Sequence, residues 1–159
     1  MDVKCQLTRI TDFVPRPGAA GFQLSNPSAL DLSAVVASLK VFEEAGMNAL
    51  RQKSLRLTAY LEQLLTAEEL VGSSPPYTII SPRDPIARGA QLSIRLESGL
   101  LNTVLECLEE DSVVIDERKP DVIRVAPAPL YNSFTDVYKF CRIFRRALEI
   151  ALQKKDLET

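Results

Sequence analysis

Arg124 is the residue whose type and position best suit specific chemistry. It lies in the β-branched run Val122-Ile123-Arg124-Val125, where strand alternation places its guanidinium on the face opposite its two apolar neighbours. Pro127 and Pro129 lack a backbone N–H and stiffen the chain just beyond this run. A guanidinium held in this way can form two parallel charge-assisted hydrogen bonds to a carboxylate. The pattern therefore indicates a carboxylate-binding arginine, and pairing with a structural Asp or Glu is the alternative.

The elements that must position Arg124 follow from periodicity and capping residues. Ser133, with Asp136 three residues later, predicts the start of the last helix, and Ser28 with Asp31 predicts a first helix over about 28–66. Gly46 is a point where that long helix can bend or break. A further helix is expected from Ser98 onward.

Four short apolar or alternating runs predict strands, at 77–80, 91–96, 113–115 and 122–125. Strand pairs between helices favour an α+β fold, with helices packed on a mostly antiparallel four-stranded sheet. We expect residues 1–16 to be a lead-in segment and residues 17–159 to form a single domain, with its sheet and later helices over 77–154.

Composition excludes several classes of function. The chain has 159 residues, 46% of them hydrophobic, a formal net charge of −2 and no histidine, so we expect neither a nucleic-acid binder nor a membrane span nor a metal site. The wide spacing of Cys5, Cys107 and Cys141, without a secretory signal, predicts reduced thiols and a cytoplasmic location.

Two segments carry a family resemblance. The sequence "IRVAPAPLYNSF" at 123–134, together with "PGAAGFQLSNP" at 17–27, resembles the C-terminal part of kynureninase. Kynureninases are pyridoxal-phosphate (PLP) hydrolases of kynurenine and 3-hydroxykynurenine. The resemblance runs from about Phe13 to about Leu152. It implies the small C-terminal domain of a fold-type-I PLP enzyme, whose PLP-holding lysine lies in a large domain upstream of the matching segment.

The resemblance also implies roles for particular residues. Ser25 and Asn26 match a pair that contacts the aromatic end of the substrate, Arg124 is expected to hold a carboxylate, and Phe22 or Tyr131 could supply an aromatic wall. Spacing alone allows Ser25 and Asn26 to be turn and helix-entry residues instead. The lysines lie in polar or terminal contexts, so no cofactor is expected for this chain alone.

Three functions follow as hypotheses. The first is a standalone kynureninase relative that binds an aryl amino acid or amino-ketone and catalyses a PLP-independent cyclisation or condensation, possible acid–base groups being Tyr131, Asp116 and Glu117. The alternative is the C-terminal part of a PLP-dependent kynureninase, and the third is a non-catalytic interaction module. The apolar stripe from Leu32 to Phe42 would in any case need a partner, so we expect a homo-oligomer.

Overall fold

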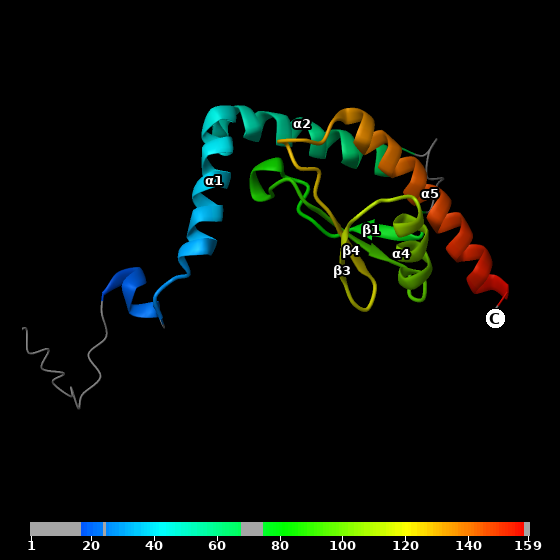
Figure 1. The fold of residues 1–159 in the computed structure, drawn as a ribbon. Helices are drawn as coiled ribbons and strands as arrows, with labels where there is room; N and C mark the ends of the chain where they lie inside the picture. Colours follow the sequence, from blue (N-terminus) through cyan, green and yellow to red (C-terminus); the bar gives the residue numbers. More distant parts are fainter. Residues whose placement is uncertain (1–16, 24, 68–74, 158–159) are drawn as a thin grey trace, which may run out of the picture. The chain divides into compact units, whose positions relative to one another are not determined.

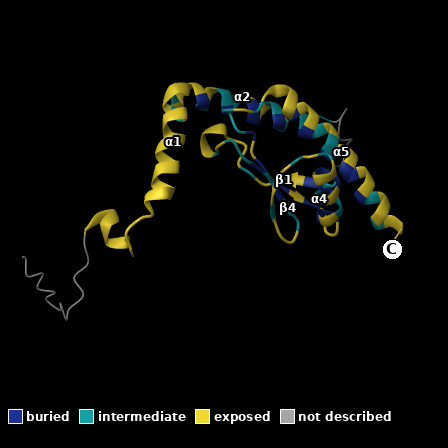
Figure 2. Ribbon diagram, viewed as in Figure 1, coloured by how far each residue is buried: buried dark blue, intermediate teal, exposed yellow. Residues whose placement is uncertain are grey.

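The computed structural model describes residues 17–23, 25–67 and 75–157. By its internal contacts the chain divides into two units, Met1–Val41 and Phe42–Thr159. The described part of the first unit holds the 3₁₀ helix η1 (Gly18–Phe22) and most of helix α1 (Ala29–Ala45). No residue of α1 is buried, and all of its residues except the half-buried Phe42 are exposed (Figure 2).

Gly46 separates α1 from α2 (Met47–Thr66), so the single long helix expected over 28–66 is two helices. Gly46 has φ 77°, a left-handed conformation that glycine adopts without steric cost. Its N–H donates to the Phe42 carbonyl at 2.9 Å, and its own carbonyl accepts from Leu50 N at 3.1 Å. The glycine therefore ends one helix and starts the next.

The second unit contains an antiparallel sheet of four strands, β1 (Tyr77–Ile79), β2 (Leu92–Leu96), β3 (Asp116–Arg118) and β4 (Val122–Val125), in the order β1-β2-β4-β3. Helix η2 (Pro85–Ala87) lies in the β1–β2 connection, and α4 (Leu101–Glu110) connects β2 to the β3–β4 hairpin. The last helix, α5 (Phe134–Leu157), packs against both α2 and α4 (Figure 1). The expected α+β fold, with helices on a four-stranded antiparallel sheet, is confirmed.

One face of the sheet contributes to the hydrophobic core. Alternate residues of β2 and β4 are buried, and they share one cluster with the inward faces of α2, α4 and α5. The most deeply buried large side chains of this cluster are Leu57, Leu61, Leu92, Ile94, Leu100, Val104, Leu108, Ile123 and Phe144. The helices thus cover one face of the sheet, and the residues between the buried positions belong to the other face.

The third strand differs from the sequence expectation. The structure places it at Asp116–Arg118, whereas the apolar run at 113–115 forms no strand. Register explains the difference, because Asp116 pairs with Arg124, so residues 113–115 would lie opposite the segment that ends at Pro127. Proline has no N–H to continue a ladder.

Candidate functional site

Arg124 lies near the centre of the sheet on the face that the helices leave open. On β4 its neighbours Ile123 and Val125 are buried, whereas its own side chain is 31% exposed. In the strand register it lies between Ser93 of β2 and Asp116 of β3. Directly opposite residues of antiparallel strands place their side chains on the same face, so these three form one polar row.

The guanidinium of Arg124 is only partly engaged. Its Nη2 forms an ion pair with Asp116 Oδ2, whereas its Nε is buried and has no hydrogen-bond partner. No hydrogen bond or ion pair joins Nη1 to any residue of the described chain, and this nitrogen is not among the buried unpaired atoms. The structural ion pair that the sequence left open is therefore present, yet it occupies one nitrogen of three.

The open face is rich in positive charge. The row beside Arg124 contains Arg95 and Arg118, each in register with Val122. Arg118 donates from Nη1 to Asp116 Oδ1 at 2.5 Å. Three guanidiniums thus share this face with one carboxylate, an arrangement that suits an anionic ligand.

The loop between β4 and α5 is rigidly held, and Asn132 is the residue that holds it. Its side-chain Oδ1 accepts from Ala128 N at 2.7 Å, and its own N–H donates to the Ala128 carbonyl at 2.9 Å. We did not single out Asn132 from the sequence, although an asparagine soon after two prolines is typical of a side-chain-locked turn. This loop therefore fixes where β4 ends and α5 begins.

The start of α5 is capped as its sequence indicates. Ser133 Oγ accepts from Asp136 N at 3.2 Å, and Asp136 Oδ2 accepts from Ser133 N at 2.8 Å, which completes a capping box. The Ser133 backbone N–H and the Ser133 hydroxyl both donate to the Asp136 carboxylate, and these two hydrogen bonds lower the pKa of that carboxyl. The Phe134 ring packs against Tyr60 of α2 in a T-shaped arrangement, with ring centroids 5.6 Å apart, so the helix start is also packed against α2.

The three residues that the sequence offered as acid–base groups, Tyr131, Asp116 and Glu117, lie in different settings. Tyr131, in the β4–α5 loop, is 78% exposed. Glu117 is half-buried and its Oε1 lies 3.9 Å from Lys119 Nζ. Asp116 accepts from two guanidiniums, which makes it a structural anchor for Arg124. The structure therefore brings Arg124 and Asp116 together, and Glu117 follows on the same strand.

Phe22, Ser25 and Asn26 belong to the first unit. All three are exposed, and Phe22, the last residue of η1, is 88% exposed. In this loop the Gln23 side-chain amide donates to the Ser25 carbonyl at 3.1 Å. Their role at the aromatic end of a substrate stays a prediction.

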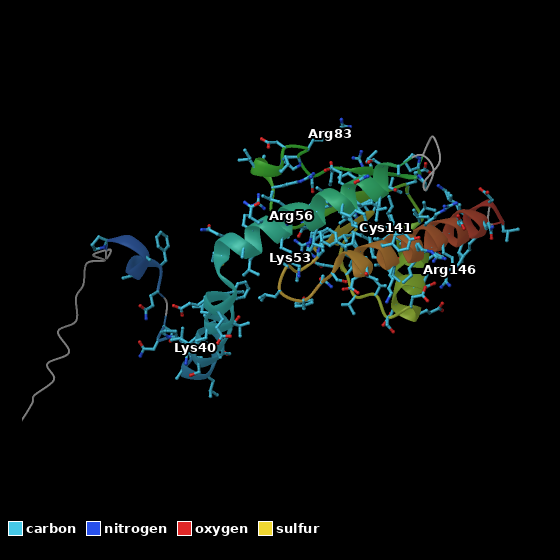
Figure 3. The ribbon with its side chains drawn as sticks, turned by 90° about the horizontal axis from the view of Figure 1, so that it is seen from above. Lys40, Lys53, Arg56, Arg83, Cys141 and Arg146 are labelled. Atoms are coloured by element: carbon cyan, nitrogen blue, oxygen red, sulfur yellow. The ribbon has the colours of Figure 1, made fainter. Side chains whose placement is uncertain are left out.

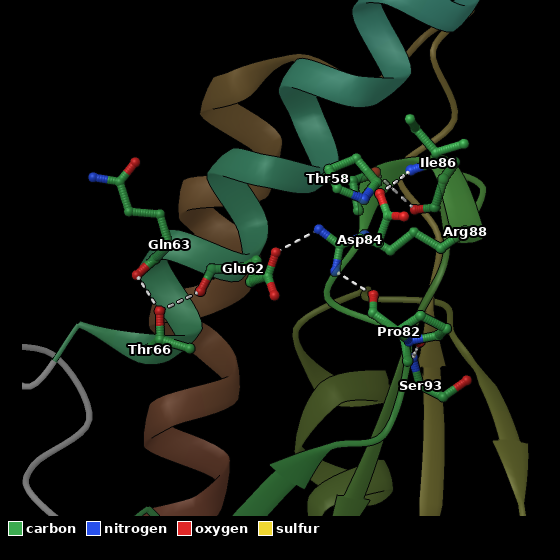
Figure 4. Close-up of polar contacts among 12 residues, drawn as sticks. Thr58, Glu62, Gln63, Thr66, Pro82, Asp84, Ile86, Arg88 and Ser93 are labelled. Atoms are coloured by element: carbon green, nitrogen blue, oxygen red, sulfur yellow. Dashed lines mark hydrogen bonds and ion pairs between the residues drawn. The ribbon is translucent and has the colours of Figure 1, made fainter.

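A polar network fastens the β1–β2 connection to α2 (Figure 4). Arg88, with a side chain only 5% exposed, forms an ion pair with Glu62 and donates to the Pro82 carbonyl at 3.0 Å. Arg51 donates to the carbonyls of Pro85 at 2.7 Å and Arg88 at 3.1 Å. This loop is therefore anchored to the helix, a contact that the sequence pattern did not indicate.

The described lysines do not form a PLP site. Lys53 and Lys155 are half-buried, and Lys40, Lys119, Lys139 and Lys154 are exposed; Lys4 lies outside the described residues. Figure 3 labels Lys40 on α1 and Lys53 on α2. A lysine that holds PLP as an imine is normally buried, so these residues do not fit that cofactor.

Two of the cysteines are described, and both are protonated packing residues. Burial raises the pKa of Cys141 on α5 to about 12, and burial followed by the nearby Glu110 raises the pKa of Cys107. Within the described ranges, no cluster of His, Cys, Asp or Glu could hold a metal ion. No helix of the described residues is long and apolar enough to span a bilayer.

Two grooves in the second unit lie away from Arg124. One of roughly 550 Å³ lies between the end of α2 and the outer side of α5, and one of roughly 370 Å³ lies beside the β4–α5 loop. Arg124 lines neither of them. Neither of these two grooves therefore belongs to the charged face around Arg124.

Comparison with known proteins places this fold and surface in a family. Residues 50–144, more than half of the chain, match the model of the kynureninase C-terminal domain. The chain is 59% identical over 156 residues to kynureninase 1 of Aspergillus clavatus, 62% identical over 144 residues to kynureninase 1 of Emericella nidulans and 61% identical over 147 residues to the kynureninase of Coccidioides immitis.

These matches cover 97%, 91% and 91% of this chain but only 32%, 30% and 31% of the respective relatives. The chain therefore spans about a third of the length of the curated relatives it matches. Its matched segment carries Arg124, the capped start of α5 and the sheet that holds them. The chain belongs to the kynureninase family, and the part that the structure describes contains the C-terminal domain of that family.

Proposed function

We propose that this chain forms the substrate-carboxylate side of a PLP-dependent kynureninase, which hydrolyses L-kynurenine or 3-hydroxykynurenine to anthranilate or 3-hydroxyanthranilate plus alanine. The observation that carries the proposal is the partly engaged guanidinium of Arg124 on a face with three arginines and one aspartate. The family match supports the substrate class.

In this proposal Arg124 binds the α-carboxylate of the amino-acid substrate. Nη1 is available to a ligand, and the neighbouring Arg95 and Arg118 add long-range attraction for an anion. Ser25, Asn26 and Phe22 would contact the aryl end, as the family resemblance implies. Tyr131 is exposed to solvent. It follows Arg124 closely in the sequence and would line the same site.

The cofactor would belong to the remainder of the assembled enzyme. PLP supplies an electron sink when it is bound, and the described lysines do not fit it. The contribution of this chain is therefore binding and orientation, since positioning the carboxylate fixes the rest of the substrate relative to the reacting groups.

A PLP-independent cyclisation or condensation by this chain alone has less support. Such a reaction would need an enclosed pocket beside Arg124, and neither groove described above is lined by it. It would also need a free acid–base group, whereas Asp116 is held by two guanidiniums. Turnover of kynurenine by the purified chain without PLP would nevertheless restore that alternative.

The test replaces the matching part of Aspergillus clavatus kynureninase 1 by this chain and follows anthranilate formation from kynurenine with PLP present. We expect activity in the chimera and a loss of about 10²-fold in kcat/KM for Arg124→Ala, because a charge-assisted contact to the carboxylate is removed. Arg145→Ala is the matched control, since Arg145 is exposed and pairs within α5 with Glu149. Equal kcat/KM for the two variants would contradict the role of Arg124.

We also propose that the apolar stripe of α1 is covered by a second copy of the chain or by the remainder of the enzyme. Four apolar side chains of this stripe are about half exposed: Leu32 48%, Val35 51%, Val36 53% and Leu39 60%. A contiguous exposed apolar surface of this kind marks an interaction site. Light scattering at micromolar concentration should give an oligomeric mass, which Leu39→Gln lowers and the control Glu44→Gln leaves unchanged. A monomeric mass for the unmodified chain would exclude self-association.

A further inference from the structure

Asp116 links two arginines on the open sheet face. Its Oδ1 accepts from Arg118 Nη1 at 2.5 Å, and its Oδ2 pairs with Arg124 Nη2. Arg118 Nη1 also donates to the Glu117 carbonyl at 2.6 Å, so the second arginine is itself tied to the backbone of β3. The carboxylate of Asp116 is therefore fixed from both sides.

The strand register makes this arrangement rigid. Asp116 lies directly opposite Arg124 in the β3–β4 hairpin, so their backbones are held by the ladder. A long arginine side chain is otherwise free to adopt many rotamers, and ordering it costs binding energy. The ion pair pre-orders Arg124 and leaves Nη1 without a partner in the described chain.

We propose that Asp116 is a positioning residue, which holds the Arg124 guanidinium in the orientation that accepts the substrate carboxylate. The inference rests on the proposed function. Asp116 does not itself touch the substrate; it acts through Arg124. Since two guanidiniums surround one carboxylate, the group keeps a net positive charge, and an incoming anion is still attracted.

The opposite role would be that of a placeholder, in which Asp116 occupies the carboxylate site until the substrate displaces it. The two roles differ in sign. Loss of a placeholder would tighten substrate binding, whereas loss of a positioning residue weakens it. The hold of Arg118 on the other carboxylate oxygen favours the fixed, positioning role.

The experiment uses the chimeric enzyme with Asp116→Asn. We expect KM for kynurenine to rise about tenfold with kcat within twofold of the unmodified chimera, because one charge-assisted contact that orients Arg124 is weakened. Asp121→Asn is the matched control, an identical change in the β3–β4 turn at a side chain that forms no hydrogen bond or ion pair with the described residues, and it should leave KM unchanged. The kynurenine analogue that lacks the α-carboxylate should inhibit both enzymes with the same Ki.

Each other outcome overturns the proposal. A lower KM in Asp116→Asn would identify a placeholder, and an equal rise in KM and in the Ki of the analogue would identify a general structural role. Arg118→Gln provides a second variant that leaves Asp116 and Arg124 in place, and it should raise KM in the same direction by a smaller factor.

A readout that needs no turnover separates this inference from the proposed function. In the unmodified chain, NMR should show slow hydrogen exchange at Arg124 Nε–H, which is buried, and faster exchange in Asp116→Asn but not in Asp121→Asn. Unchanged exchange in Asp116→Asn would show that Asp116 does not order Arg124. An inactive chimera with the expected exchange pattern would instead count against the proposed function alone.

Discussion

The ion pair between Arg88 and Glu62 allows a prediction in which the two partners are not equivalent. The Arg88 side chain is 5% exposed and the Glu62 side chain 25% exposed, so water can hydrate an unpaired Glu62 better than an unpaired Arg88. Breaking a buried ion pair by removing one partner typically costs ~3–5 kcal/mol. The cost should therefore depend on which partner is removed.

Glu62→Leu leaves the buried Arg88 guanidinium with the Pro82 carbonyl as its one remaining acceptor among the described residues, so we expect it to lower the free energy of unfolding by about 3 kcal/mol. Arg88→Met leaves a carboxylate that is a quarter exposed, and solvent screening reduces its expected cost to about 1–2 kcal/mol. The double variant replaces both charges by apolar groups and should be less destabilised than Glu62→Leu alone.

Urea unfolding followed by circular dichroism measures these differences, with equal slopes against urea concentration as the check on two-state behaviour. The double-mutant cycle should give a coupling energy of at least about 1.5 kcal/mol. The reasoning is refuted if Arg88→Met costs more than Glu62→Leu, or if all three variants lie within about 0.5 kcal/mol of the unmodified chain.

Three further predictions concern packing, reactivity and pH. Leu57→Ala should lower the free energy of unfolding by roughly 2–5 kcal/mol in the same urea assay, because Leu57 is completely buried in the core. Iodoacetamide at pH 8 should label Cys141 roughly 10³ times more slowly in the folded chain than in urea, since its pKa is about 12 rather than the ordinary 9.0; similar rates, resolved by peptide mass spectrometry, would contradict its burial. Because the folded pKa of Asp136 lies below its ordinary 3.8, the stability it contributes is present above that value and is lost as pH falls through the lowered pKa. Asp136→Asn, which removes the titrating carboxyl, should therefore reduce the loss of stability between about pH 6 and pH 2.5, and an unchanged pH profile would show that the capping box does not hold that carboxylate.

Local signals in the sequence predicted much of the fold. The capping box of Ser133 and Asp136 and the alternating strand, expected at 91–96 and observed at 92–96, depend on residues that are close in the chain. The same is true of Gly46, where the sequence indicated that the expected long helix can bend or break. The amino-acid sequence of the segment at 123–134 also indicated the kynureninase family, which the comparisons confirm. Predictions of this kind succeed because backbone geometry and capping are local.

The third strand illustrates why hydrophobic pattern alone was insufficient. The apolar run at 113–115 looks like a strand, but Val114 is 96% exposed and the neighbouring Val113 and Ile115 pack on the core without forming a ladder. A β-branched run is compatible with either state. The hairpin register, which pairs Asp116 with Arg124, decided between them.

The sequence by itself therefore determined the α+β class, the starts of α1 and α5, three of the four strands and the family of the chain. The tertiary structure decided which carboxylate meets Arg124, which strand borders β4 and how Arg88 and Glu62 anchor the β1–β2 connection. The physical reason is the distance along the chain. Helix propensity and capping act over a few residues, whereas an ion pair or a strand register depends on the three-dimensional placement of partners that no local pattern specifies.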